Sequence, residues 1–151
     1  MEIRSLADHP NAIPVLADWF HREWYSYDKR SSVEIEAQLR DSLNRDSLPI
    51  TFLALSGTEV IGTVSLDTSD LPPYDHFSPW LASLYVLPCR RGGGVGRALV
   101  KHLVRFALER EISPIYLWTP GSTRLYEECG WKVLCRDIYT GHPITLMQLE
   151  Q

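Results

Sequence analysis

The chain has 151 residues, of which 44% are hydrophobic and 23% are charged, and its formal net charge is −4. This length predicts a single domain over residues 1–151 that buries roughly 70% of the surface of the unfolded chain. The acidic balance argues against nucleic acid as a partner, because nucleic-acid binders usually carry a basic excess. No apolar run approaches the ~20 residues of a membrane span, and the N-terminus lacks the pattern of a signal peptide.

The cysteines and histidines favour neither a disulfide framework nor a metal site. The three cysteines, Cys89, Cys129 and Cys135, are odd in number and contain no C-x-x-C pair, and the histidines show no metal-ligand spacing. We therefore expect reduced, buried or half-buried thiols, a cytoplasmic protein and no bound metal.

Hydrophobic periodicity and turn residues predict alternating strands and helices along the whole chain. In order, they are a strand at 2–6, a helix from about 8 to 24, a helix at 31–44, strands at 50–55, 60–66 and 80–86, a helix at 95–107, a strand at 115–119, a short helix at 123–129, and strands at 131–138 and 144–149 around a 141–143 turn. The order β-α-α-β-β-β-α-β-α-β-β predicts an α/β fold with one mixed sheet, neither a barrel nor a doubly wound layer.

Three helix ends carry recognisable capping residues. Ser31 and Glu34 have the spacing of a capping box, and Asp8 or Asn11 is expected to cap the first helix. Gly130 follows the short helix at the position where a left-handed residue commonly ends a helix.

A glycine-rich turn is the strongest functional signal in the chain. Four glycines within residues 92–96 follow an apolar strand that ends near Pro88 and precede an apolar-periodic helix. Glycines let the backbone approach a ligand, and a helix N-terminus offers unpaired N–H groups to an anion. A Walker A loop would need Lys-Ser/Thr after Gly96, and a dinucleotide fingerprint would need a glycine in place of Leu99, so both are excluded.

The remaining pattern, Arg91-x-x-Gly94-x-Gly96, resembles the acyl-CoA signature of the GCN5-related N-acetyltransferase (GNAT) superfamily. The resemblance covers nearly the whole chain, because the order of elements matches and the segment 125–131 (LYEECGW) is similar to a second block of that family. It implies the GNAT fold, acetyl-CoA as co-substrate and a gap between the strands at 80–86 and 115–119 that holds the acyl group.

The resemblance also implies roles for residues on the donor side. Strand residues pair their backbone with the pantetheine arm, residues of the turn wrap the pyrophosphate, and the arginine after the turn adds a phosphate contact. The strand residues are Leu84, Tyr85 and Val86, and the others are Arg91, Gly92, Gly93, Gly94, Val95, Gly96 and Arg97.

For the chemistry, Tyr126 matches the tyrosine that protonates the leaving thiolate in this family, so we expect it to be the general acid. The strand glutamate that serves several members as the base is missing, and Trp80 stands at about its position. Side chains that flank the strand are therefore candidates to accept the amine proton. They are Asp67, Asp70, Asp75 and His76, of which we take Asp75 and His76 as the predicted proton acceptors.

The function implied is acetyl transfer from acetyl-CoA to a primary amine of a small molecule by direct attack in a ternary complex. Carboxylates on the expected acceptor side favour a cationic amine such as a polyamine or an aminoglycoside; they are Glu23, Asp28, Asp67, Asp70 and Asp75. The aromatic residues Trp19, Trp24, Tyr25 and Tyr27 are expected either in the core or on the wall of the acceptor pocket. Two alternatives stay open, namely acetylation of peptide or protein N-termini and a non-catalytic acyl-CoA sensor, and a homodimer is compatible with the sequence.

Overall fold

The computed structural model describes all 151 residues. Its main elements are β1 (Glu2–Ser5), α1 (Ile13–Trp24), α2 (Ser32–Asp41), β2 (Ile50–Ser56), β3 (Glu59–Asp67), β4 (Trp80–Val86), α3 (Val95–Glu109), β5 (Ile115–Thr119), α4 (Arg124–Glu128), β6 (Lys132–Tyr139) and β7 (His142–Leu149). This is the predicted order of strands and helices, and it confirms the mixed α/β fold class.

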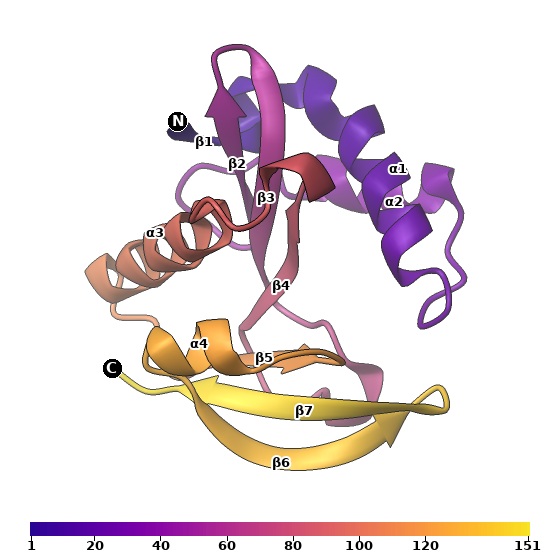
Figure 1. Cartoon of the computed structure of the whole chain (residues 1–151), viewed down its shortest axis with the longest axis vertical. Coiled ribbons are helices and arrows are strands. Elements are labelled where there is room, and N and C mark those ends of the chain that lie inside the picture. Colours follow the sequence, from indigo (N-terminus) through magenta and orange to yellow (C-terminus); the bar gives the residue numbers. More distant parts are fainter.

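All seven strands form one sheet in the order β1-β2-β3-β4-β5-β7-β6. Every neighbouring pair is antiparallel except β4 and β5, which run parallel and share a single paired position, Trp80 with Tyr116. Figure 1 shows the result: β1 to β4 stand upright in one half, while β5, β7 and β6 lie across the bottom. The sheet is therefore split between its fourth and fifth strands.

Helices cover both faces of the upright half, with α1 and α2 on one face and α3 on the other (Figure 1). Alternate residues of β2 separate the two cores, since Leu53 packs with the α1–α2 cluster while Phe52 and Ala54 pack with the α3 cluster. This is the period-two alternation of a sheet buried on both faces.

Two of the three predicted helix caps are confirmed. The Ser31 hydroxyl accepts from Glu34 N at 3.2 Å, and the Glu34 carboxylate accepts from Ser31 N at 3.3 Å, which completes the capping box. Gly130 (φ +96°) ends α4 with hydrogen bonds from Gly130 N to Glu127 O and from Trp131 N to Tyr126 O. The prediction for α1 is wrong, because short 3-10 turns precede it and its N-cap, Ala12, offers no side-chain acceptor.

Two smaller expectations also need correction. Cys89 and Cys135 are exposed, and only Cys129 is half-buried, although all three thiols are unpaired. His142 already belongs to β7, and the turn before it is Thr140-Gly141, with φ values of +48° and +82°. A two-residue hairpin turn of this kind needs positive φ at both positions, so the strands extend further than their hydrophobic residues indicated.

Candidate active site

A bulge in β4 shapes the site at the split in the sheet. Pairing with β3 shifts between Thr63–Tyr85 and Ser65–Ala82, and Ser83, inside the shift, has φ of +57°. A serine rarely adopts this left-handed conformation, and such strained residues cluster at functional sites. The sequence carries no signal for it, because nothing distinguishes Ser83 from an ordinary strand residue.

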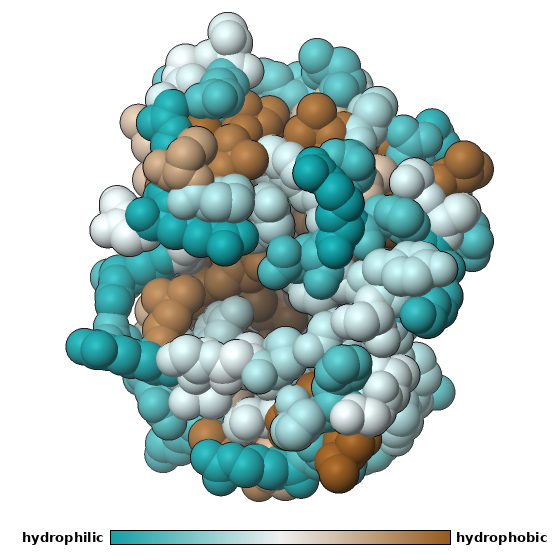
Figure 2. Space-filling view, turned by 45° about the vertical axis from the view of Figure 1, so that its right-hand side comes forward, coloured by the Kyte–Doolittle hydropathy of each residue, from teal (hydrophilic) through white to brown (hydrophobic).

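A cavity of about 310 Å³, here called the central cavity, occupies the gap where β4 and β5 diverge. Its walls come from both sides of the split and from the loop after α1, and Figure 2 shows a hollow with a hydrophobic floor and a hydrophilic rim on this side of the molecule. The lining residues are Glu23, Trp24, Tyr27, Asp28, Arg30, Asp70, Leu81, Ala82, Ser83, Leu84, Trp118, Thr119, Pro120, Gly121, Tyr126 and Tyr139. The expected gap for the acyl group is thus present.

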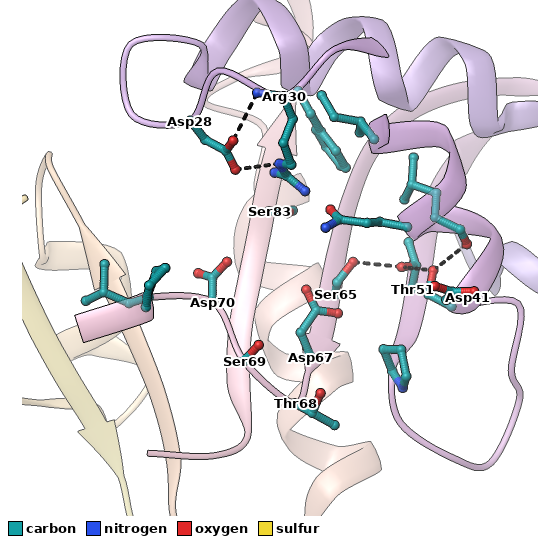
Figure 3. A pocket seen from close by; sticks show the side chains of 18 of the residues that line it. Asp28, Arg30, Asp41, Thr51, Ser65, Asp67, Thr68, Ser69, Asp70 and Ser83 are labelled. Carbon is teal, nitrogen blue, oxygen red and sulfur yellow. Dashed lines mark hydrogen bonds and ion pairs between the residues drawn. The ribbon is translucent and has the colours of Figure 1, made fainter. Parts of the chain in front are cut away.

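A second cavity of about 390 Å³, here called the acidic cavity, lies beside the first beneath α2 (Figure 3). The two cavities share the residues Asp28, Arg30, Asp70, Ser83 and Tyr139. Further carboxylates line only the acidic cavity; they are Asp41, Asp67 and Asp75. The two cavities are therefore adjacent, and together they are called the cleft, in which the acidic cavity has the larger number of carboxylates.

Two of these carboxylates have pKa values far from that of an ordinary aspartate. Burial, reinforced by the nearby Asp70 charge, raises the pKa of Asp67 to about 7. Burial also raises the pKa of Asp70 to about 7, although a hydrogen bond from Trp118 Nε1 to its Oδ2 (2.8 Å) favours the ionised form. Both groups are therefore poised to exchange protons near neutral pH.

The glycine turn presents a row of unsatisfied backbone donors. The N–H groups of residues 92–97 make no hydrogen bond within the chain, and the first helical bond of α3 runs from Ala98 N to Gly94 O at 3.0 Å. Gly92 and Gly94 have φ near +85°, and a Cβ built on either would meet no atom within 4 Å. An open row of N–H groups at a helix N-terminus is suited to a polyphosphate, so the turn fits the pyrophosphate of coenzyme A.

The arginines around the turn have partners inside the chain. Arg91 Nε donates to Val86 O at 2.9 Å, and its guanidinium lies 5.4 Å from the Tyr85 ring centre. Arg97 pairs with Glu128 of α4, which raises the pKa of Arg97. The turn therefore offers a phosphate mainly its backbone N–H groups, because the Arg97 side chain is already paired with Glu128 of α4.

Tyr126 lies in α4 and lines the central cavity. Burial raises its pKa to about 12, so the phenol keeps its proton throughout the physiological range. The strand residues Leu84, Tyr85 and Val86 are half-buried along the last part of β4, beyond its one pairing with β5.

Of the other residues predicted for the site, the structure places some at the cavities and others outside them. Asp75 is exposed at the acidic cavity, whereas His76 is exposed and packs on Phe77, with ring centres 4.3 Å apart, outside both cavities. Trp24 and Tyr27 line the central cavity, and Trp19 is buried against Tyr85. Arg30, Trp118 and Tyr139 also line the cleft, and sequence patterns had not singled them out.

Comparison with known families agrees with this geometry. A model of the acetyltransferase (GNAT) family matches residues 13–131. The chain belongs to this family. The fold, the family and the enzyme class, an acetyl-CoA-dependent N-acetyltransferase, are those expected from the sequence.

Solved structures of this family share the fold at low sequence identity. A ribosomal-protein-alanine N-acetyltransferase from Brucella melitensis has a TM-score of 0.77 and 22% identity over 100% of both chains. An aminoglycoside 6'-acetyltransferase type Ii has a TM-score of 0.74 and 21% identity over 99% of this chain and 97% of its own. A spermidine N-acetyltransferase chimera that includes Vibrio cholerae sequence has a TM-score of 0.73 and 20% identity over 100% and 96%.

A search of curated protein sequences finds no match. In the structure, no helix combines the length and the apolar character needed to cross a membrane, and no three His, Cys, Asp or Glu side chains are grouped as metal ligands.

The buried Asp67 carboxylate should make folding pH-dependent. In the unfolded chain Asp67 ionises near its ordinary pKa of 3.8, whereas the folded protein holds the proton until about pH 7. Stability is therefore lost as the pH rises between these values, and Asp67→Asn is expected to raise the free energy of unfolding near pH 8 by about 1–3 kcal/mol.

Near pH 4 the same substitution should change the free energy of unfolding little, because Asp67 is then largely protonated in the folded protein. Urea unfolding at the two pH values measures the difference. Asp18→Asn, on the exposed face of α1, is the matched control, and an equal effect of Asp67→Asn at both pH values would contradict the assignment.

Proposed function

We propose that this protein transfers the acetyl group of acetyl-CoA to a primary amine of a small cationic molecule by direct attack in a ternary complex. The observation that carries the proposal is the central cavity, where a neutral phenol (Tyr126) and a carboxylate poised near neutral pH (Asp70) face the same space. The reaction needs one group at the leaving sulfur and another at the attacking amine.

The donor half of the site, which binds acetyl-CoA, consists of the glycine turn and β4. Six successive backbone N–H groups, at residues 92–97, are available for the pyrophosphate, and the positive end of α3 reinforces them. Past Trp80, β4 has no strand partner on its β5 side, so its backbone from Leu84 to Val86 can pair with the pantetheine arm. Bound in this way, the thioester reaches the central cavity. Two solved structures of this fold are described as complexes, one with acetyl coenzyme A and one with coenzyme A.

Tyr126 would act on the departing thiolate. The thiol of a cysteine side chain has a pKa of about 8.5, and thiols in general are more acidic than this phenol, whose pKa is about 12. The thiolate is therefore too weak a base to take the phenol proton completely, and Tyr126 stabilises it mainly by donating a hydrogen bond. This sharpens the general-acid role expected from the sequence into charge stabilisation at the leaving sulfur.

Asp70 is the strongest candidate to accept the amine proton. It lines both cavities, and Trp118 Nε1 holds its Oδ2 from the β5 side of the split. An alkylammonium has a pKa near 10, so a base must remove a proton before or during attack. Asp75 and His76, predicted from sequence for this task, are exposed, and neither lines the central cavity.

The acceptor half of the site, which binds the amine, is characterised by its negative charge. Glu23, Asp28 and Asp70 face the central cavity, where Arg30 is the one cation. Such a field concentrates cationic molecules at the cleft. Solved proteins of this fold include aminoglycoside and spermidine acetyltransferases as well as a ribosomal-protein-alanine N-acetyltransferase. The preference for a cationic small-molecule amine therefore rests on the acidic lining of the cavity.

The decisive experiment is a thiol-release assay with acetyl-CoA and a panel of amines, aminoglycosides and peptides. Amine-dependent release, with the acetylated product identified by mass, is expected. Tight binding of acetyl-CoA without release for any acceptor would instead support the alternative of an acyl-CoA sensor.

Gly94→Glu should abolish acetyl-CoA binding, since it places a negative charge among the phosphate-binding N–H groups and strains a residue with φ of +86°. Isothermal calorimetry measures the affinity. Gly57→Glu is the matched control, because Gly57 also has positive φ and open space but lies in the β2–β3 turn. Retained binding of acetyl-CoA by the Gly94 variant would contradict the assignment of the glycine turn as the phosphate-binding site.

Tyr126→Phe should lower kcat by well over tenfold, corresponding to more than about 1.4 kcal/mol of transition-state stabilisation. The affinity for acetyl-CoA should stay nearly constant, because the phenol acts on the thiolate and not on the bound thioester. Steady-state kinetics and calorimetry separate the two effects, and an unchanged kcat would remove Tyr126 from the mechanism.

Asp70→Asn should lower kcat near pH 8 by at least about tenfold, as expected for the loss of a general base. Trp118→Phe should keep activity but shift the acidic limb of the kcat profile to higher pH, because the hydrogen bond that favours the ionised carboxylate is lost. If Asp75→Asn or His76→Asn causes the loss while Asp70→Asn does not, the proton acceptor is the one expected from sequence.

A further inference from the structure

The acidic cavity contains a carboxylate with no partner. Asp67 is half-buried, makes no hydrogen bond and no ion pair, and its accessible part faces the acidic cavity (Figure 3). A buried charged group without a partner costs several kcal/mol or holds on to its proton, so it is rarely left in this state without a ligand.

A chain of three buried hydroxyls ends beside this carboxylate. Ser42 Oγ donates to Leu39 O at 2.8 Å and lies 2.8 Å from Thr51 Oγ1, which lies 2.7 Å from Ser65 Oγ. Each hydroxyl has one proton, so Thr51 must donate to Ser42, and Ser65 must donate to Thr51. The Ser65 oxygen therefore faces the acidic cavity with lone pairs only.

Ser65 and Asp67 stand two residues apart on β3 and so point to the same face of the sheet. Both present acceptors to the acidic cavity. The nearby cation, Arg30, is already engaged, since its Nε lies 2.5 Å from Asp28 Oδ2 and its backbone N donates to Asp28 Oδ1 at 3.1 Å. The acidic cavity has neutral donors such as Gln38, but its one cation, Arg30, is already paired with Asp28.

We infer that the acidic cavity binds a second ammonium group of the acceptor, held by the Asp67 carboxylate and Ser65 Oγ, while the reacting amine lies in the central cavity beside Asp70. The preferred acceptors are then aliphatic diamines and longer polyamines, not monoamines. This inference rests on the proposed function. An ammonium ion brings the unpaired positive charge that this cavity lacks, and its three N–H groups can donate to the acceptors of Asp67 and Ser65.

A metal ion is the other cation that oxygen ligands could attract. The carboxylates here are not grouped as a set of three metal ligands, and the cavity of about 390 Å³ is far larger than a single ion needs. An organic cation with an alkyl chain fits this volume, and its other end would lie toward the adjacent central cavity, with which the acidic cavity shares lining residues.

The second ammonium should make acceptor binding pH-dependent. Asp67 and Asp70, each with a pKa raised to about 7 by burial, are mainly protonated near pH 6 and ionised near pH 8, whereas both ammonium groups stay charged. The KM for a diamine should therefore fall across this range, and diamine binding near pH 7 should release protons. The other charged or titratable groups that face the acidic cavity are Asp28, Arg30, Asp41, Asp75 and Tyr139.

The test compares n-butylamine with 1,4-diaminobutane and spermidine as acceptors in the thiol-release assay. For the unmodified protein, kcat/KM should be at least about tenfold higher for the diamine, the range expected for one charge-assisted hydrogen bond. Asp67→Asn and Ser65→Ala should each remove most of this preference, because they raise the KM for the diamine much more than the KM for n-butylamine. Asp18→Asn, an equal loss of charge on the outer face of α1, should preserve the preference.

Equal kcat/KM for the monoamine and the diamine, or variants that affect both substrates alike, would overturn the inference while leaving the acetyltransferase intact. If no amine supports thiol release, the proposed function fails instead. Calorimetry with 1,4-diaminobutane then still decides the inference, because binding that Asp67→Asn abolishes supports a cation site and absence of binding contradicts it.

Discussion

The architecture depends on how β4 and β5 are held together at one end and kept apart at the other. They share the single paired position of Trp80 and Tyr116, and an aromatic cluster surrounds it. Phe77 stacks on Tyr116 with ring centres 4.4 Å apart, and Trp80 Nε1 donates to Phe77 O at 2.7 Å. Trp80 is fully buried, and Phe77 and Tyr116 are partly buried against it. The packed rings stiffen this junction, so divergence of the strands beyond it leaves a gap of defined shape. Both cavities are lined by residues at this divergence.

The fold and the donor half could be anticipated from the sequence because their signals are local. Hydrophobic periodicity places β4 at 80–86 and β5 at 115–119, and the glycines at 92–96 mark the start of α3. The errors fall where tertiary context decides: α1 begins without the expected side-chain cap, and β7 extends through His142 and Pro143 into residues that resembled a turn.

The acceptor half could be anticipated only in outline. The sequence places several aspartates near the cleft, but it does not indicate which of their carboxylates become desolvated in the folded protein. Asp67 and Asp70 become proton-holding groups because α2, β3 and the loop after β3 enclose them, and this is a property of long-range packing. Asp75, on the same loop, stays exposed. Likewise, the direction of the Ser42–Thr51–Ser65 chain follows from three elements that meet only in the folded protein.

The ion pair between Arg97 and Glu128 has a mechanical consequence. Arg97 belongs to the first turn of α3, next to the row of unpaired N–H groups, and Glu128 ends the short helix that carries Tyr126. Both side chains are partly exposed, so solvent screens the pair and it contributes little to stability. Its effect is on alignment, because it links α3, which packs on the upright half of the sheet, to α4, which carries Tyr126. The two halves of the molecule are thus linked twice, by the Trp80–Tyr116 pairing of the strands and by the Arg97–Glu128 ion pair of the helices. The second link helps to hold the Tyr126 phenol at a fixed distance from the glycine turn.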